Sequence, residues 1–163
     1  MTKITSASFS AQSSVAVDSC FSSTYTRYLI NYTITTVSSA GIDLQFQWRY
    51  AGPTTQTSDY YGIVVPTQRG ASSTNTVSEN AAQLTLCNNL QASPEYTAGM
   101  INVDRVGNSS DNPLLWGNGF WGYYTGFMNY GGYQNVARTY TGFLLKTDSG
   151  TMTGTYSVYG VSN

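Results

Sequence analysis

Residues Ile42 to Tyr50 alternate between apolar and polar side chains without interruption. The apolar members are Ile42, Leu44, Phe46, Trp48 and Tyr50, and the polar members are Asp43, Gln45, Gln47 and Arg49. Successive side chains of a strand point to opposite faces, so this pattern predicts a β-strand with an apolar face in the core and a polar face in solvent. The chain must therefore build at least one half-buried strand.

Composition extends the preference for strands to the rest of the chain. Thr, Val, Ile and Tyr, which fit a pleated and half-buried surface, are frequent. Only 9% of the 163 residues are charged, against roughly 25% in an average soluble domain, so hydroxyl and amide groups must hydrate the surface. A chain of this length suits one domain, which we expect to span residues 1–163.

Two pairs of strands are expected near the ends of the chain. Tyr28 to Val37 is rich in β-branched and aromatic residues, and a short Ser- and Gly-containing segment separates it from Ile42 to Tyr50. Thr141 to Lys146 and Met152 to Tyr159 flank a second Gly-containing connection. Connections of this length predict an antiparallel hairpin in each case.

Shorter strands are expected between these pairs. They are Tyr60 to Val65, closed by Pro66, then Thr76 to Leu86, Met100 to Val106 and a segment from Gln134 to Tyr140. Clusters of Gly, Pro, Asn and Ser separate them at the spacing typical of sandwiches and jelly rolls. The sequence therefore predicts an all-β protein, a single-domain antiparallel β-sandwich with a jelly-roll-like arrangement.

Several classes of chemistry are disfavoured. The chain has no His, which excludes Ser-His-Asp and Cys-His nucleophile systems and the usual histidine metal sites. It lacks a phosphate-binding Gly-rich loop and a dinucleotide fingerprint. We therefore expect no enzyme, no catalytic residues and no cofactor. A glycosidase would need two carboxylates, for which the candidates are Glu79, Glu95, Asp59 and Asp104, and none of them stands in a motif.

Two groups of residues, a set of acidic and amide side chains and the two cysteines, can each be interpreted in two ways. Asp104, Asn108 and Asp111 are close enough in sequence for a Ca²⁺ loop, but these residue types are also ordinary turn formers, which we favour over a metal site. Cys20 and Cys87 are expected to be buried free thiols, with a single disulfide as the alternative.

Charge and hydropathy restrict the partners. A net charge of -1 provides no basic field for phosphates, so nucleic acid is not expected as a partner. No apolar run approaches the roughly 20 residues of a membrane helix, and the N-terminal residues lack the pattern of a signal peptide. The sequence predicts a protein made in the cytoplasm without membrane insertion.

The segment from Asn108 to Gly132 interleaves glycine with large aromatic residues. So many glycines predict turns or close backbone approaches. We take as binding candidates Trp116, Phe120, Trp121, Tyr123, Tyr124 and Tyr130. Their rings could stack on sugars while Asn118 and Asn129 supply hydrogen bonds. The alternative is that these rings close one end of the core or contact a neighbouring subunit, as they would in a homo-oligomer.

Five segments carry a resemblance to a known group of proteins. They are Tyr28 to Tyr32, Ile42 to Tyr50, Thr57 to Tyr61, Gly142 to Leu144 and Ser149 to Gly160. Together these segments resemble small virion-surface modules of tailed bacteriophages, which occur as capsid knob or decoration proteins and in tail-fibre tips. The resemblance covers about half the chain, and residues 69 to 133 match nothing in these modules.

The resemblance implies a non-enzymatic structural protein displayed on the virion surface. Its implied partners are the major capsid protein or another virion protein, with a host-surface glycan as a further partner. The chain starts with its own Met and has no fibre shaft or adaptor, which favours a capsid decoration protein over a tail-fibre tip or carbohydrate-binding module using Trp116 to Tyr133. Docking is expected through the aromatic segment or through Ile4 to Val17.

Overall fold

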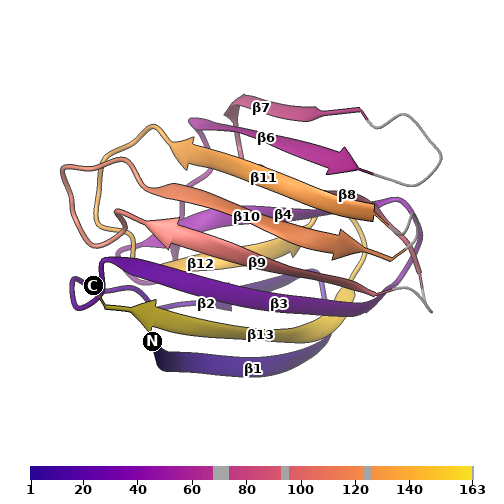
Figure 1. The fold of residues 1–163 in the computed structure, drawn as a ribbon, viewed down its shortest axis with the longest axis horizontal. Coiled ribbons are helices and arrows are strands. Elements are labelled where there is room, and N and C mark those ends of the chain that lie inside the picture. Colours follow the sequence, from indigo (N-terminus) through magenta and orange to yellow (C-terminus); the bar gives the residue numbers. More distant parts are fainter. Residues whose placement is uncertain (68–73, 93–95, 123–125, 163) are drawn as a thin grey trace.

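The computed structural model describes residues 1–67, 74–92, 96–122 and 126–162, which form two antiparallel β-sheets packed face to face (Figure 1). The predicted all-β antiparallel sandwich is therefore confirmed. The larger sheet has eight strands, in the spatial order β1 (Thr2–Gln12), β13 (Met152–Val161), β3 (Arg27–Val37), β9 (Thr97–Asp104), β10 (Leu114–Trp121), β11 (Gly126–Gln134), β6 (Tyr60–Thr67) and β7 (Thr76–Ala81).

The smaller sheet lies behind the larger one in the view of Figure 1. Its five strands are β2 (Ser14–Val17), β12 (Gly142–Thr147), β4 (Ile42–Tyr50), β5 (Thr54–Thr55) and β8 (Leu84–Leu90). Strand β4 is central, because β12 pairs with one edge while β5 and β8 pair with successive parts of the other.

Aromatic side chains dominate the core between the sheets. Phe46 stacks on Phe143 with ring centroids 5.7 Å apart and meets Trp48 edge to face at 4.7 Å. Tyr28 and Tyr60 enter the same fully buried cluster from the larger sheet. Burial of these large rings adds to the hydrophobic stabilisation that the aliphatic core residues supply.

The polar face of β4 is not solvated as predicted. Gln45, Gln47 and Arg49 are all buried, because β4 is enclosed by neighbouring strands and loops. Gln47 Nε2 donates to Ala82 O at 2.8 Å. Arg49 forms a two-point ion pair with Asp18, with Nε 2.6 Å from Oδ1 and Nη2 3.1 Å from Oδ2. Strand β4 is thus covered on both faces.

The two predicted hairpins are wrong. Strands β3 and β4 lie in different sheets, as do β12 and β13, so each short connection crosses the sandwich instead of turning back within one sheet. Two glycines allow these crossings, because Gly41 and Gly150 adopt positive φ angles of 85° and 61°. The crossings also support each other, since Asp148 Oδ1 accepts a hydrogen bond from Asp43 N at 2.8 Å.

Three shorter strand predictions also need correction. The single strand expected from Thr76 to Leu86 is divided between β7 and β8, which belong to different sheets. The segment from Gln134 to Tyr140 is irregular beyond the last residue of β11. Strand β6 continues through Pro66, which pairs with Met128 on β11 but has no partner from β7 among the described residues.

Candidate functional site

The glycine-rich segment forms a regular antiparallel pair of strands. In this pair, β10 and β11, Trp116 lies opposite Gly131 and Phe120 lies opposite Phe127. Positive φ angles among the described glycines occur only at Gly41, Gly52 and Gly150, so the glycines of β10 and β11 are extended. Of the two explanations that the sequence allowed, turns or close backbone approaches, the close approach holds for inward-facing glycines such as Gly117 and Gly132.

The inward-facing glycines make space for two tyrosine rings. A Cβ on Gly117 would collide with Met100 O and the Tyr130 ring, and a Cβ on Gly99 would collide with the Tyr32 ring. Burial raises the pKa of Tyr32 and of Tyr130 further above neutral pH, so both hydroxyls are protonated and can act as donors. The Tyr130 hydroxyl lies 3.1 Å from Met100 O and 3.3 Å from Asn118 O and can donate to either carbonyl.

The predicted binding residues separate between the two faces of β10 and β11. Trp116 and Phe120 point outward and are 38% and 41% exposed. Trp121 and Tyr130 point inward and are only 6% and 5% exposed, so for these two the alternative of core packing holds. The remaining candidates, Tyr123 and Tyr124, lie outside the described residues.

Several exposed apolar residues escaped the sequence prediction. We call the outward side chains of β6, β10 and β11 the aromatic face; its large members are Ile63, Val65, Trp116, Phe120, Phe127 and Tyr133. Phe127, 63% exposed, meets Phe120 edge to face with centroids 5.9 Å apart. Exposed and buried side chains alternate along Phe127 to Tyr130, but Phe127 and Met128 are both apolar, so hydropathy alone does not distinguish the two faces.

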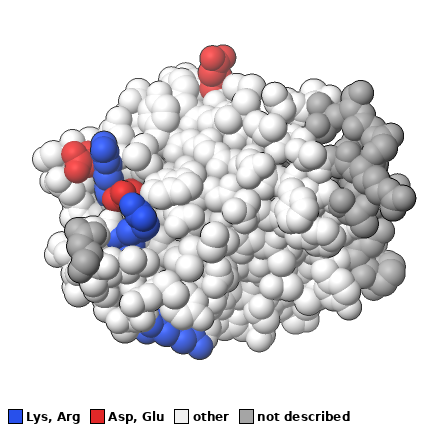
Figure 2. Space-filling model, in the orientation of Figure 1, with Lys and Arg blue, Asp and Glu red and all other residues white. Residues whose placement is uncertain are grey.

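The aromatic face carries very little charge. Figure 2 views the larger sheet from its outer side, and the broad centre of the molecule shows no charged side chains. The nearby charges belong to the ends of strands, such as Arg27 at the start of β3 and Asp104 at the end of β9. The Arg27 guanidinium lies 5.3 Å from the centre of the Trp116 ring and covers part of it.

A groove of about 410 Å³ runs across the outer side of β3, β9, β10 and β11. Its lining includes Asn31, Thr33, Met100, Asn118, Phe120 and Phe127, with Ala98 and backbone between them. Neither Asn31 nor Asn118 has a side-chain hydrogen bond within the part of the chain that the structure describes. The groove thus combines unengaged amides, a hydroxyl and two aromatic rings without a charge.

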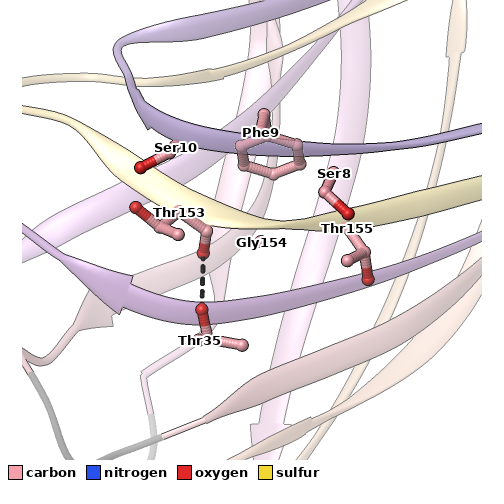
Figure 3. Close-up of a pocket in the computed structure, with 7 residues that line it drawn as sticks. All are labelled: Ser8, Phe9, Ser10, Thr35, Thr153, Gly154 and Thr155. Carbon is pink, nitrogen blue, oxygen red and sulfur yellow. Dashed lines mark hydrogen bonds between the residues drawn. The ribbon is translucent and has the colours of Figure 1, made fainter.

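A second depression, of about 400 Å³, lies over β1, β13 and β3 (Figure 3). Ser8, Phe9, Ser10 and Thr155 are among its lining residues. The hydroxyl of Thr35 is already engaged, because it donates to Thr153 O at 3.2 Å. This depression offers small hydroxyls and one ring but no group suited to acid, base or nucleophilic chemistry.

The carboxylates considered for catalysis or metal binding mostly have local partners. Asp59 accepts a hydrogen bond from Ser58 Oγ at 2.5 Å, and Asp104 accepts one from Arg105 N at 2.7 Å. Asp111 Oδ2 accepts one from Asn108 Nδ2 at 3.0 Å. These are contacts typical of turn-forming residues.

The other two candidate carboxylates are Glu79 and Glu95. Glu79 lies on β7, and Glu95 is outside the described residues. Within the described ranges, no group of three or more His, Cys, Asp or Glu side chains is placed to hold a metal ion. Both cysteines are buried as free thiols, and burial raises the pKa of Cys20 to about 12.

The fold and this surface define an antiparallel β-sandwich with an aromatic face that carries little charge. Comparison with protein-family models, curated proteins and solved structures gave no match for this chain. Among the described residues, no helix is long and apolar enough to cross a membrane.

Proposed function

We propose that this chain is a non-enzymatic structural protein displayed on the surface of a tailed-phage virion, as a capsid knob or decoration protein. Its partner would be the major capsid protein or another virion protein. The sequence resemblance to virion-surface modules supports this proposal, and the strand order and the first strand of the fold add two structural arguments.

The strand order is consistent with a jelly roll carrying two insertions. When β5 to β7 and the pair β10 and β11 are set aside, eight strands remain. Renumbered in chain order, they lie as 1-8-3-6 in one sheet and 2-7-4-5 in the other, which is the order of a jelly roll. This architecture is frequent in viral capsid proteins and lectins, although a fold alone does not define a function.

The observation that carries the proposal is the exposure of β1. Among the described strands, this 11-residue edge strand pairs only with β13, and along it only Thr5 and Phe9 are partly covered. Its other edge presents unpaired backbone groups, and Lys3 is its only charge. Such an edge is suited to pairing with a strand of another protein, because backbone hydrogen bonds supply affinity and small side chains permit close approach.

Deletion of Met1 to Ser10 tests this attachment. We expect the shortened protein to stay folded, because most side chains of the deleted residues are exposed, and to disappear from purified particles. Val77→Ala, an exposed change on β7 at the opposite edge of the sheet, is the control and should leave incorporation intact. Normal incorporation of the deletion variant would contradict attachment through β1.

Quantitative mass spectrometry of fractionated particles tests the location. Many copies per particle that follow tail-less heads would support a capsid decoration protein. A few copies that follow isolated tails would favour a tail-fibre tip, and absence from both fractions would overturn the virion proposal.

A second candidate function, a tail-fibre receptor-binding or carbohydrate-binding module, is favoured by the aromatic face. Exposed rings beside asparagine amides on an uncharged surface are typical of sites for polar, neutral ligands. This function is compatible with display on a particle, because the aromatic face and the β1 edge occupy different parts of the larger sheet.

A further inference from the structure

We propose that the groove over Ala98 is a binding site for a neutral oligosaccharide. The groove differs from the site suggested by the sequence, which lay on the residues of one segment. It is built from four strands, and six of its lining residues come from β3 and β9: Asn31, Tyr32, Thr33, Ala98, Gly99 and Met100.

The hollow exists because a small residue lies between larger ones in the sheet register. Thr33, Ala98, Phe120 and Phe127 are cross-strand neighbours on β3, β9, β10 and β11. Opposed positions in a sheet point to the same face, so the single methyl group of Ala98 leaves a gap between Thr33 and Phe120. The gap is therefore fixed by the backbone of the sheet.

The next row along the strands supplies hydrogen-bonding groups. Asn31, Met100, Asn118 and Asn129 are neighbours in this row, and none of the three amides has a side-chain hydrogen bond to another described residue. Each amide presents two donors and one acceptor, which match the hydroxyl groups of a sugar. The Tyr130 hydroxyl beneath the row helps to hold the backbone of Met100 and Asn118 in place.

Charge selects the kind of ligand. The charged Arg27 lies four residues before Asn31 on β3, about 13 Å away along an extended strand. A uronate, sulfate or phosphate group over Ala98 would lose hydration without gaining an opposite charge there, because the Arg27 guanidinium lies at the Trp116 end of the aromatic face. The surface therefore suits an uncharged sugar.

Aromatic rings at two positions suit a ligand longer than one sugar. Phe120 and Phe127 border one side of the groove, and their exposed surfaces can pack on the apolar face of a sugar ring. Trp116 projects from the same face of β10, also about 13 Å from Phe120 along the strand. Asn118 lies between them, so a linear oligosaccharide along β10 would meet a ring, an amide and a second ring.

The test is a titration of the full ¹⁵N-labelled chain with neutral and charged hexasaccharides. The neutral probes are maltohexaose, cellohexaose, mannohexaose and chitohexaose, and the charged probe is hexagalacturonate. We expect at least one neutral sugar to shift the amide resonances of Phe120 and Phe127, with little or no shift from hexagalacturonate. Absence of such shifts with every neutral sugar at about 10 mM would overturn the proposal.

Two variants and a control assign the binding to the groove. Ala98→Tyr fills the gap with a residue that suits a strand, and Asn118→Ala removes a central amide. Each should weaken binding by about tenfold or more without lowering the thermal midpoint, whereas Val77→Ala should bind like the native chain. Undiminished binding by Ala98→Tyr would overturn the assignment.

The titration and the particle experiments can fail independently. Sugar binding is measured on the isolated chain, so it can succeed even if the protein is absent from virions. If Ala98→Tyr blocks incorporation into particles while no neutral sugar binds, the groove is a protein contact and the carbohydrate proposal is wrong.

Discussion

At the scale of single residues, Tyr60 links the two sheets through a buried hydroxyl. Trp48 N donates to Tyr60 Oη at 2.7 Å, and the same hydroxyl donates to Gln56 O at 3.0 Å. We expect Tyr60→Phe to leave both backbone groups without this partner and to lower the free energy of unfolding by about 1–3 kcal/mol. Denaturant unfolding measures the change.

Tyr61→Phe is the matched control for this prediction. Tyr61 stacks on Tyr133 with centroids 5.3 Å apart, and its hydroxyl has no hydrogen bond to the described residues. Its loss should change stability by less than about 0.5 kcal/mol. Equal effects of the two variants would show that the Tyr60 hydrogen bonds contribute little.

At the scale of elements, the β10 and β11 pair requires glycine at some positions and tolerates replacement of glycine by alanine at others. Gly117→Ala would place a methyl group against Met100 O and the Tyr130 ring, so we expect a loss of about 1–3 kcal/mol. Gly131→Ala meets only ordinary contacts, the nearest at 3.7 Å, and should be neutral or stabilising by up to about 1 kcal/mol. Thermal and denaturant unfolding of the two variants measure the difference, and equal stabilities would contradict the packing argument.

At the scale of the whole molecule, the core should fail at alkaline pH. Burial raises the pKa of Cys20 from 9.0 to about 12, and it also raises the pKa of Cys87, Tyr32, Tyr60 and Tyr130. The unfolded chain therefore loses these protons at a lower pH than the folded chain. Stability from these groups is fully present below about pH 8 and falls as the pH rises from about 9 towards 12.

Urea unfolding at a series of pH values checks this sign. Each fully shifted group contributes a slope of up to about 1.4 kcal/mol per pH unit within that window. A free energy of unfolding that stays constant up to pH 11 would show that these groups are accessible to hydroxide in the folded protein.

The sequence by itself determined strand β4, because side-chain alternation is a local property and is uninterrupted there. Ile42 to Tyr50 became β4 with the predicted bounds, and its apolar face entered the core. Side-chain parity along β10 places Trp116 and Phe120 on one face and Trp121 on the other, and the structure shows that the face of Trp121 is the inner one. The sequence therefore predicts that Trp116 and Phe120 share one face of a strand.

Only the tertiary structure decided which strands are partners and where the groove lies. A short Gly-containing connection can turn within a sheet or cross to the other sheet, and the local sequence does not distinguish the two. The groove depends on Asn31, Ala98 and Asn118, which are brought together by pairing of β3, β9 and β10. The pairing register of these strands is fixed by burial of the whole inner face of the sheet. It therefore cannot be predicted from any single segment of the sequence.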